Sequence, residues 1–135
     1  MQSALDFSGK VVIVTGGGKG VGKGISERFL EAGADVAICG RSEPEGLPTA
    51  NGRTAFFRAL DVRDPDAVQA FVNEVAEHFG RIDVLVNCLA HAVGRVRGPN
   101  IDYSDADLLQ EFDVKAVGYF RCIQAVVPHM RQRQW

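Results

Sequence analysis

The sequence predicts an α/β fold, a doubly wound parallel sheet with helices on both of its faces. Three observations support this prediction. Short apolar runs typical of buried strands alternate with segments of helical periodicity, a glycine-rich turn joins the first such strand to the first helix, and 135 residues with a hydrophobic fraction of 46% suit one domain with its own core. Strands that alternate with helices imply βαβ crossovers, and therefore a parallel sheet within residues 1–135.

The first strand is expected at Lys10–Val14, because a continuous β-branched run is typical of a strand buried on both faces. A helix follows the glycine-rich turn and ends before Gly33, since glycine is common just after a helix. Apolar residues repeat along this helix every three or four positions, which indicates one buried face. That face is expected to contain Val21, Ile25, Phe29 and Ala32.

Three further strands are expected at Val36–Cys39, Thr54–Leu60 and Ile82–Val86. Each is a short apolar run with turn-forming residues on at least one side, as strands of a buried sheet usually are. The segment Gly40–Arg53, between the second and third strands, is rich in Gly, Pro and Ser and is therefore expected to be a loop.

The helix between the third and fourth strands has clear start and stop signals. Asp64 is expected to be its N-cap, with Pro65 at the first helical position, and Gly80 is expected to end it. Its apolar residues again follow helical spacing, which predicts a single buried face. That face is expected to contain Val68, Phe71, Val72, Val75 and Phe79.

The last third of the chain begins with an irregular segment, Cys88–Tyr103. Ser104 followed three positions later by Asp107 resembles a capping box, with Asp where Glu or Gln is more common. Helical periodicity then continues to about Arg133, with a break expected near Asp113. No internal domain boundary is expected.

Composition argues against several classes of partner. The net charge of −2 gives no basic field for nucleic acid or anionic lipid, and no apolar run is long enough to cross a membrane. The segment Met1–Asp6 lacks the pattern of a signal peptide, and three widely spaced cysteines do not form a disulfide framework. We therefore expect a cytoplasmic protein without a nucleic-acid or membrane partner.

Glycines dominate the turn Thr15–Gly22 between the first strand and the first helix. Glycine adopts positive φ and lets the main chain approach a ligand closely, and a helix N-terminus offers unpaired N–H groups to an anion. Between a buried strand and an amphipathic helix, this turn predicts a pyrophosphate site. Parallel sheets bind ligands beyond the carboxyl ends of their strands, so contacts are also expected at Gly40–Ser42, Asp61 and Asn87.

A nucleoside-triphosphate site is the alternative for the same turn. Residues Gly17–Lys23 fit the spacing G-x-x-x-x-G-K of a phosphate-binding P-loop. The next position should be Ser or Thr, because its hydroxyl binds Mg²⁺, but it is Gly24. A P-loop NTPase therefore remains the weaker hypothesis.

The sequence resembles the short-chain dehydrogenase/reductase family. The pattern T-G-x-x-x-G-x-G is matched by Thr15, Gly16, Gly20 and Gly22. Leu60–Val62 is similar to the adenine-contacting segment after the third strand, and Asp83–Asn87 to the fourth strand and the start of the N-N-A-G motif. The resemblance implies a partial Rossmann-type fold, with the first four strands and their helices and no fifth strand. It also implies hydride transfer between a nicotinamide cofactor and a small carbonyl or alcohol substrate.

The resemblance assigns roles to individual residues. The glycine-rich turn would bind the pyrophosphate, Asp61 would accept a hydrogen bond from the adenine amino group, Val62 would contribute its backbone, and Asn87 would lie near the nicotinamide-side ribose. For Asp61, a turn or capping role before Asp64 is the alternative. The expected cofactor-binding residues are Thr15, Gly16, Gly18, Lys19, Gly20, Val21, Gly22, Arg41, Ser42, Asp61, Val62 and Asn87.

The end of the second strand predicts NADP(H) in preference to NAD(H). An NAD site usually has a carboxylate there for the ribose 2′-hydroxyl, but the residues at that place are Gly40 and Arg41. Arg41 can form charge-assisted hydrogen bonds with a 2′-phosphate, and Lys19 in the turn is a second cation. The alternative is that Arg41 is only solvated and binds no phosphate.

Two motifs depart from the family pattern. The N-N-A-G motif is Asn87-Cys88-Leu89-Ala90, so only its first residue matches. Lys115 occupies the position of the family's catalytic Asn, where a lysine cannot accept hydrogen bonds. The alternative is that Lys115 is simply an exposed lysine on a helix. No metal site is expected, because Cys88 and His91 alone do not make a four-ligand set, and Cys88 is expected to pack.

No catalytic residue is assigned with certainty. The family uses a Tyr-x-x-x-Lys pair and a Ser after the fifth strand. Tyr103 and Tyr119 are followed four positions later by Asp107 and Ile123, so neither fits. We therefore expect a truncated domain that is inactive by itself. A non-catalytic, cofactor-binding remnant is the alternative.

Apolar surface predicts self-association. The fourth strand would form an exposed edge of the sheet, and such edges pair with other chains. The last helix carries an apolar set that the sheet would cover only in part, and this favours a homo-oligomer. That set comprises Val117, Phe120, Val126 and Val127.

Overall fold

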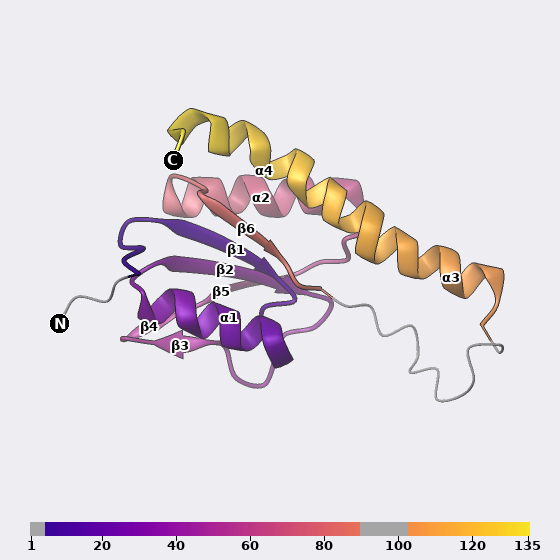
Figure 1. The fold of residues 1–135 in the computed structure, drawn as a ribbon, viewed down its shortest axis with the longest axis horizontal. Coiled ribbons are helices and arrows are strands. Elements are labelled where there is room, and N and C mark those ends of the chain that lie inside the picture. Colours follow the sequence, from indigo (N-terminus) through magenta and orange to yellow (C-terminus); the bar gives the residue numbers. More distant parts are fainter. Residues whose placement is uncertain (1–4, 90–102) are drawn as a thin grey trace.

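The computed structural model describes residues 5–89 and 103–135 as a sheet with helices on both sides (Figure 1). The elements in chain order are β1 (Val11–Thr15), α1 (Gly20–Glu31), β2 (Asp35–Gly40), β3 (Thr49–Ala50), β4 (Arg53–Thr54), β5 (Phe56–Ala59), α2 (Pro65–Phe79), β6 (Val84–Asn87), α3 (Asp105–Phe112), the π-helix η2 (Asp113–Gly118) and α4 (Tyr119–Arg133). None of the described helices is long and apolar enough to cross a membrane.

The main sheet has the strand order β5-β2-β1-β6, and every neighbouring pair is parallel. The chain passes outward from β1 through β2 to β5 and then returns to the other side of β1 as β6. The strand order therefore reverses at β1, and the carboxyl ends of β1 and β6 flank the place where such sheets bind ligands. The predicted fold class, a partial doubly wound sheet, is confirmed.

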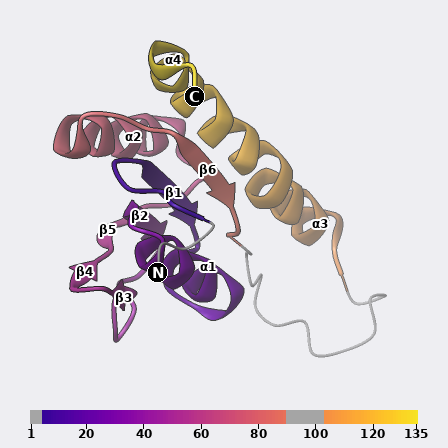
Figure 2. The same cartoon turned by 60° about the vertical axis from the view of Figure 1, so that its left-hand side comes forward.

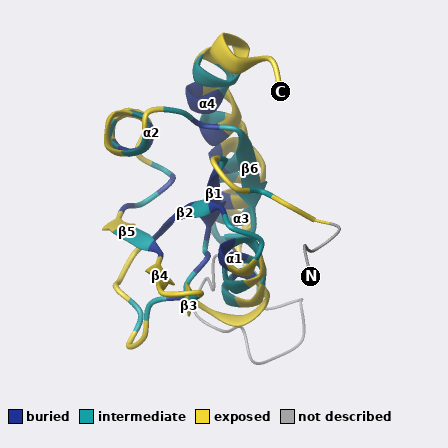
Figure 3. Cartoon of the chain, turned by 90° about the vertical axis from the view of Figure 1, so that its left-hand side faces the viewer, coloured by how far each residue is buried: buried dark blue, intermediate teal, exposed yellow. Residues whose placement is uncertain are grey.

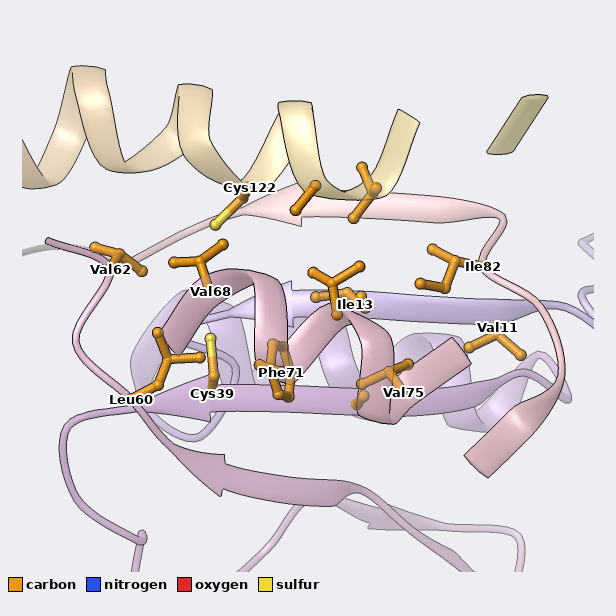
Figure 4. Packing of buried hydrophobic residues seen from close by; sticks show 14 of the residues in the cluster. Val11, Ile13, Cys39, Leu60, Val62, Val68, Phe71, Val75, Ile82 and Cys122 are labelled. Atoms are coloured by element: carbon orange, nitrogen blue, oxygen red, sulfur yellow. The ribbon is translucent and has the colours of Figure 1, made fainter. Parts of the chain in front are cut away.

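Alternate residues of β1 enter two separate apolar cores. Val12 and Val14 pack with Leu30 of α1 on one face of the sheet. Val11 and Ile13 pack on the other face with residues of α2 and α4, as Figure 4 shows from close by. Figures 1 and 2 show α1 on one side of the sheet and α2 with α4 on the opposite side. A strand buried on both faces requires a continuous apolar run, and β1 has one.

Helix α1 differs from the prediction in its start and in its buried face. It begins at Gly20, inside the glycine-rich turn, and Val21 is 75% exposed rather than buried. The fully buried positions are Gly22, Ser26 and Leu30. Ile25 and Phe29 are partly buried and pack against the same core, as predicted, but the polar Ser26 also faces inward, toward the turn.

The segment Gly40–Arg53 contains a short antiparallel hairpin, β3–β4, where a loop was predicted. Its turn residues Asn51 and Gly52 both have positive φ, the conformation that two-residue hairpins prefer. Thr54 belongs to this hairpin, so the third parallel strand is shorter than predicted and is β5. Likewise β6 begins two residues later than predicted, at Val84.

The helical rod formed by α3, η2 and α4 (residues 105–133) confirms three predictions and corrects one. Ser104 and Asp107 form the capping box, and the expected break near Asp113 is the π-helix η2. Val117 and Phe120 are exposed, as predicted, whereas Val126 is fully buried in the core that contains Val11 and Ile13. Figure 3 shows buried and exposed residues along α4. Because α4 lies along β6 (Figure 2), more of its apolar surface is covered than the sequence indicated.

Asp83, just before β6, links that strand to β1. Its fully buried carboxylate accepts hydrogen bonds from the Val11 N–H at 2.9 Å and from Arg81 at 2.6 and 2.8 Å. Burial raises the pKa of Asp83, but the hydrogen bonds from Arg81 and Val11 outweigh burial, so the pKa lies below its ordinary value of 3.8. The ionised form is therefore the one that stabilises the fold.

We expect Asp83→Asn to lower the free energy of unfolding by about 2 kcal/mol at neutral pH, since it weakens charge-assisted hydrogen bonds to a buried group. Chemical denaturation measures this loss. Asp35→Asn is the matched control, because Asp35 also starts a strand and forms only an exposed pair with Arg53; its effect should stay below about 1 kcal/mol.

The same pair of proteins should differ in pH dependence. A carboxylate with a lowered folded pKa contributes its stability above the unfolded pKa and loses it as pH falls through the folded pKa. The gap between wild type and Asp83→Asn should therefore narrow in acid. An unchanged gap down to about pH 2 would contradict the role given to Asp83.

Candidate functional site: a cavity at the carboxyl edge of the sheet

A cavity of about 660 Å³ lies at the carboxyl ends of β1, β2 and β5. This volume is in the range of small-molecule and cofactor sites. All of the predicted cofactor-binding residues line it except Thr15 and Asn87. The lining comprises Gly16, Gly18, Lys19, Gly20, Val21, Gly22, Cys39, Gly40, Arg41, Ser42, Pro44, Phe57, Leu60, Asp61, Val62, Cys88, Leu89 and Val114.

The glycine-rich turn has the conformation that its sequence predicts. Gly16 and Gly20 have φ values of +67° and +52°, which disfavour residues with a side chain. A Cβ at Gly16 would lie 2.8 Å from the Cα of Leu89, so glycine allows the segment after β6 to approach. A Cβ at Gly22 would collide with the carbonyl oxygen of Gly16. The motif is therefore required by packing of the main chain against itself.

Ser26 hydrogen-bonds the main chain of the glycine-rich turn, a role that was not predicted from the sequence. Its side chain is fully buried, and its Oγ lies 3.0 Å from the carbonyl oxygen of Gly17 and 2.9 Å from that of Gly22. A Cβ at Gly17 would lie 2.7 Å from this Oγ. The signal in the sequence was a polar residue four positions after Gly22, in the middle of an otherwise apolar face.

Thr15 does not line the cavity but binds residues that do. It is buried, and its Oγ1 accepts hydrogen bonds from the N–H groups of Cys88 at 3.1 Å and Leu89 at 3.3 Å. These bonds join the end of β1 to the chain leaving β6, across the point where the strand order reverses. Thr15 therefore orients the residues that border Gly16.

Asn87 and Tyr119 secure the same segment from the other side. The Asn87 Nδ2 donates to the Tyr119 carbonyl at 3.4 Å, and the Tyr119 hydroxyl donates to the Leu89 carbonyl at 2.7 Å. Among the described residues, the buried Oδ1 of Asn87 has no hydrogen-bond partner. Burial, with smaller contributions from Cys88 and Cys122, raises the pKa of Tyr119 above 10.0.

The cysteines near the site behave as packing residues. Cys88 contacts the core between the sheet and α1, as predicted, and also lines the cavity. Burial raises the pKa of Cys39 to about 12 and that of Cys122 to about 11, so both remain protonated at neutral pH. The described residues contain no group of three metal ligands, and His91 and Ala90 lie outside the described residues.

Two exposed cations line the cavity. Lys19 is the exposed N-cap of α1, and Arg41 follows β2 and is also exposed. Pro44, in the loop after Arg41, is close enough to the turn that a Cβ at Gly18 would lie 2.8 Å from its Cγ. Within the part of the chain that the structure describes, neither cation forms a salt bridge. Both are therefore available to an anion.

Asp61 lies in a turn and its carboxylate is already engaged. It accepts hydrogen bonds from the Arg63 guanidinium, at 2.6 and 3.0 Å, and from the Arg63 N–H at 2.9 Å. These hydrogen bonds from Arg63, aided by the charge of Arg41, lower the pKa of Asp61 to about 2. The turn role considered for Asp61 is thus present, and its contact with adenine stays a prediction.

Lys115 does not border the cavity. Its ammonium lies 3.6 Å from a carboxylate oxygen of Glu111 in the preceding helical turn, and its side chain is 54% exposed. The neighbouring Val114 is fully buried and lines the cavity instead. The exposed-lysine alternative therefore describes Lys115 in this structure.

Comparison with known proteins gives consistent matches. A family profile described as short chain dehydrogenase matches residues 10–135. L-fucose dehydrogenase of Bos taurus is 32% identical over 137 residues, covering 98% of this chain and 48% of that protein. Glucose 1-dehydrogenase 2 of Bacillus subtilis is 34% identical over 131 residues, covering 93% and 50%. A variant of actinorhodin polyketide ketoreductase, solved with NADPH, has a TM-score of 0.77 and 31% identity, covering 93% and 49%.

The chain spans about half the length of the curated relatives that it matches. The family profile covers almost all of this chain, including the glycine-rich turn, the helical rod and the strand ends predicted to contact the nucleotide at Gly40–Ser42, Asp61 and Asn87. The structure has a parallel sheet, and its glycine-rich turn lies where the strand order reverses. The chain belongs to the short-chain dehydrogenase family.

Proposed function

We propose that this chain is the NADP(H)-binding part of an oxidoreductase that transfers hydride between the nicotinamide and a small carbonyl or alcohol substrate. One observation carries the proposal: the cavity joins a main-chain anion site, the turn Gly16–Gly22, to two cations without salt bridges to described residues, Lys19 and Arg41. A dinucleotide with an additional phosphate has a pyrophosphate for the main-chain site and a 2′-phosphate for the two cations. One solved relative contains NADPH, and two structures of the same fold contain NAD, so the choice depends on these two cations.

Each part of the cavity suits one part of the cofactor. The pyrophosphate would bind at the N-terminus of α1, where N–H groups are unpaired and the helix dipole is positive. The 2′-phosphate would bind Arg41, Lys19 and the hydroxyl of Ser42. The adenine would lie against apolar residues, with the remaining lone pairs of Asp61 as acceptors. Those apolar residues are Leu60, Val62 and Val114.

We propose that the cavity residues bind and orient the cofactor; none of the described residues that line the cavity belongs to a Tyr-x-x-x-Lys pair. The bound cofactor would supply the hydride. Burial raises the pKa of Tyr119, and its hydroxyl already donates a hydrogen bond to the Leu89 carbonyl. Lys115 is directed to Glu111. We therefore propose that proton transfer uses residues other than those described at this cavity, and that a non-catalytic cofactor-binding protein is the alternative.

Two further proposals concern the surroundings of the protein. An exposed apolar surface on the α3–η2–α4 rod supports a homo-oligomer, since monomers seldom leave such patches open. It includes Leu108, Leu109, Phe112, Val117, Phe120 and Ile123. Three free cysteines support a reducing compartment such as the cytoplasm, and the charge of the chain gives no support to a nucleic-acid partner.

Fluorescence titration should show tighter binding of NADPH than of NADH. Arg41→Met should weaken NADPH about 10-fold, the equivalent of one charge-assisted hydrogen bond, and leave NADH nearly unchanged. Arg28→Met is the control, because Arg28 has the same side chain but pairs with Glu31 on the exposed side of α1. Equal losses for both cofactors, or tight binding of Mg-ATP in place of either, would overturn the proposal.

The 135-residue chain should bind NADPH without oxidising it. Mixed with a panel of aldehydes and ketones, it should leave the NADPH absorbance constant, because neither Tyr103 nor Tyr119 belongs to a Tyr-x-x-x-Lys pair that could donate the proton for reduction of a carbonyl. The same assay on a chain extended to the length of the relatives is the control. Turnover by the shorter chain would contradict the proposed division of roles.

A further inference from the structure

Arg121, in the first turn of α4, contacts the loop at the adenine end of the cavity. Its guanidinium donates to the Val62 carbonyl at 3.0 Å and to the Asp113 carbonyl at 3.4 Å, and it forms a 2.8 Å ion pair with the Asp113 carboxylate. Val62 and Arg121 are 59 positions apart in the sequence. One side chain thus joins the loop after β5 to the π-helix η2 and to α4.

The side chain of Val62 is fixed by the same region. It is fully buried and faces Gly118, where a Cβ would lie 2.8 Å from the Val62 Cγ2. Figure 4 shows Val62 at one end of the core cluster, close to the helical rod. Val62 and Val114 both line the cavity, so the distance between the loop and η2 sets the width of the cavity at this end.

Four charges of alternating sign surround this contact. Asp61 binds Arg63, the charge of Asp113 contributes to raising the pKa of Arg63, and Asp113 binds Arg121. The Arg121 side chain is only 21% exposed, so solvent and salt screen it less than a surface arginine. The two aspartates and two arginines together carry no net charge, so the arrangement adds none beside the proposed adenine position.

We propose that Arg121 is a positioning residue for nucleotide binding: by holding the Val62 carbonyl to η2, it keeps the Asp61–Arg63 loop and Val114 at the separation that fits an adenine ring. This inference rests on the proposed cofactor function. It assigns Arg121 no contact with the cofactor. Losing the guanidinium leaves the Val62 carbonyl without this donor and frees the loop to move relative to η2.

The test compares ligands that contain the adenosine with one that does not. In Arg121→Met, affinity for NADPH and for adenosine 2′,5′-bisphosphate should fall about 10-fold, while affinity for reduced nicotinamide mononucleotide stays within 2-fold, as one lost hydrogen bond to a charged donor implies. Arg121→Lys keeps one donor and a charge and should recover part of the loss. Arg131→Met, on the exposed side of the same helix, is the control and should match wild type.

A thermal melt accompanies each variant, because a purely structural arginine would change the melting temperature and leave the affinity of the folded protein intact. If Arg121→Met does not fold, Asp113→Asn, which removes the carboxylate partner at a 40% exposed position, should weaken the same two ligands in the same direction. Unchanged adenosine affinity in the folded variants, or equal losses for all three ligands, overturns the inference. Failure of the wild-type chain to bind NADPH would instead reject the proposed function.

Discussion

The close approach of two main chains at the point where the strand order reverses determines the geometry of the site. Gly16 leaves β1 with positive φ and passes beside the backbone of Leu89, which leaves β6. A side chain at Gly16 is incompatible with this contact. Thr15 then joins the two strand ends through its hydroxyl. Because both chains diverge from that point, a cavity forms between them and the N-terminus of α1.

The charges around the cavity divide into two groups with different roles. Arg63 and Arg121 are paired with Asp61 and Asp113, and they hold loops and helices in place. Lys19 and Arg41 have no such partners among the described residues and line the cavity as exposed side chains. A paired guanidinium has little left to offer a ligand, whereas an unpaired one can form charge-assisted hydrogen bonds with a phosphate. We therefore propose that Lys19 and Arg41 alone determine cofactor preference.

Much of this structure could be predicted from local signals. Buried β-branched runs, N-caps and the glycine-rich turn each depend on neighbouring residues, so the strands, the helices and most of the cavity lining followed from the sequence. The hairpin β3–β4 also had a local signal, Asn51-Gly52, which the high content of turn-forming residues around it obscured.

The contacts that could not be predicted join distant parts of the chain. Ser26 faces inward because it meets the turn carbonyls, whereas Val21 is exposed. Val114 lines the cavity together with Val62, which is distant from it in the sequence. Neither helical periodicity nor a motif records such packing, since both arise from tertiary contacts.

The central claim is that a dinucleotide pyrophosphate binds the main-chain amides between β1 and α1. Backbone amide NMR of the chain during NADPH titration tests it most directly. The account predicts that the largest shifts occur at Gly18–Gly22 and at Cys88 and Leu89, which border the same cavity. Shifts confined to the exposed face of α3 and α4, with the glycine-rich turn unchanged, would contradict it.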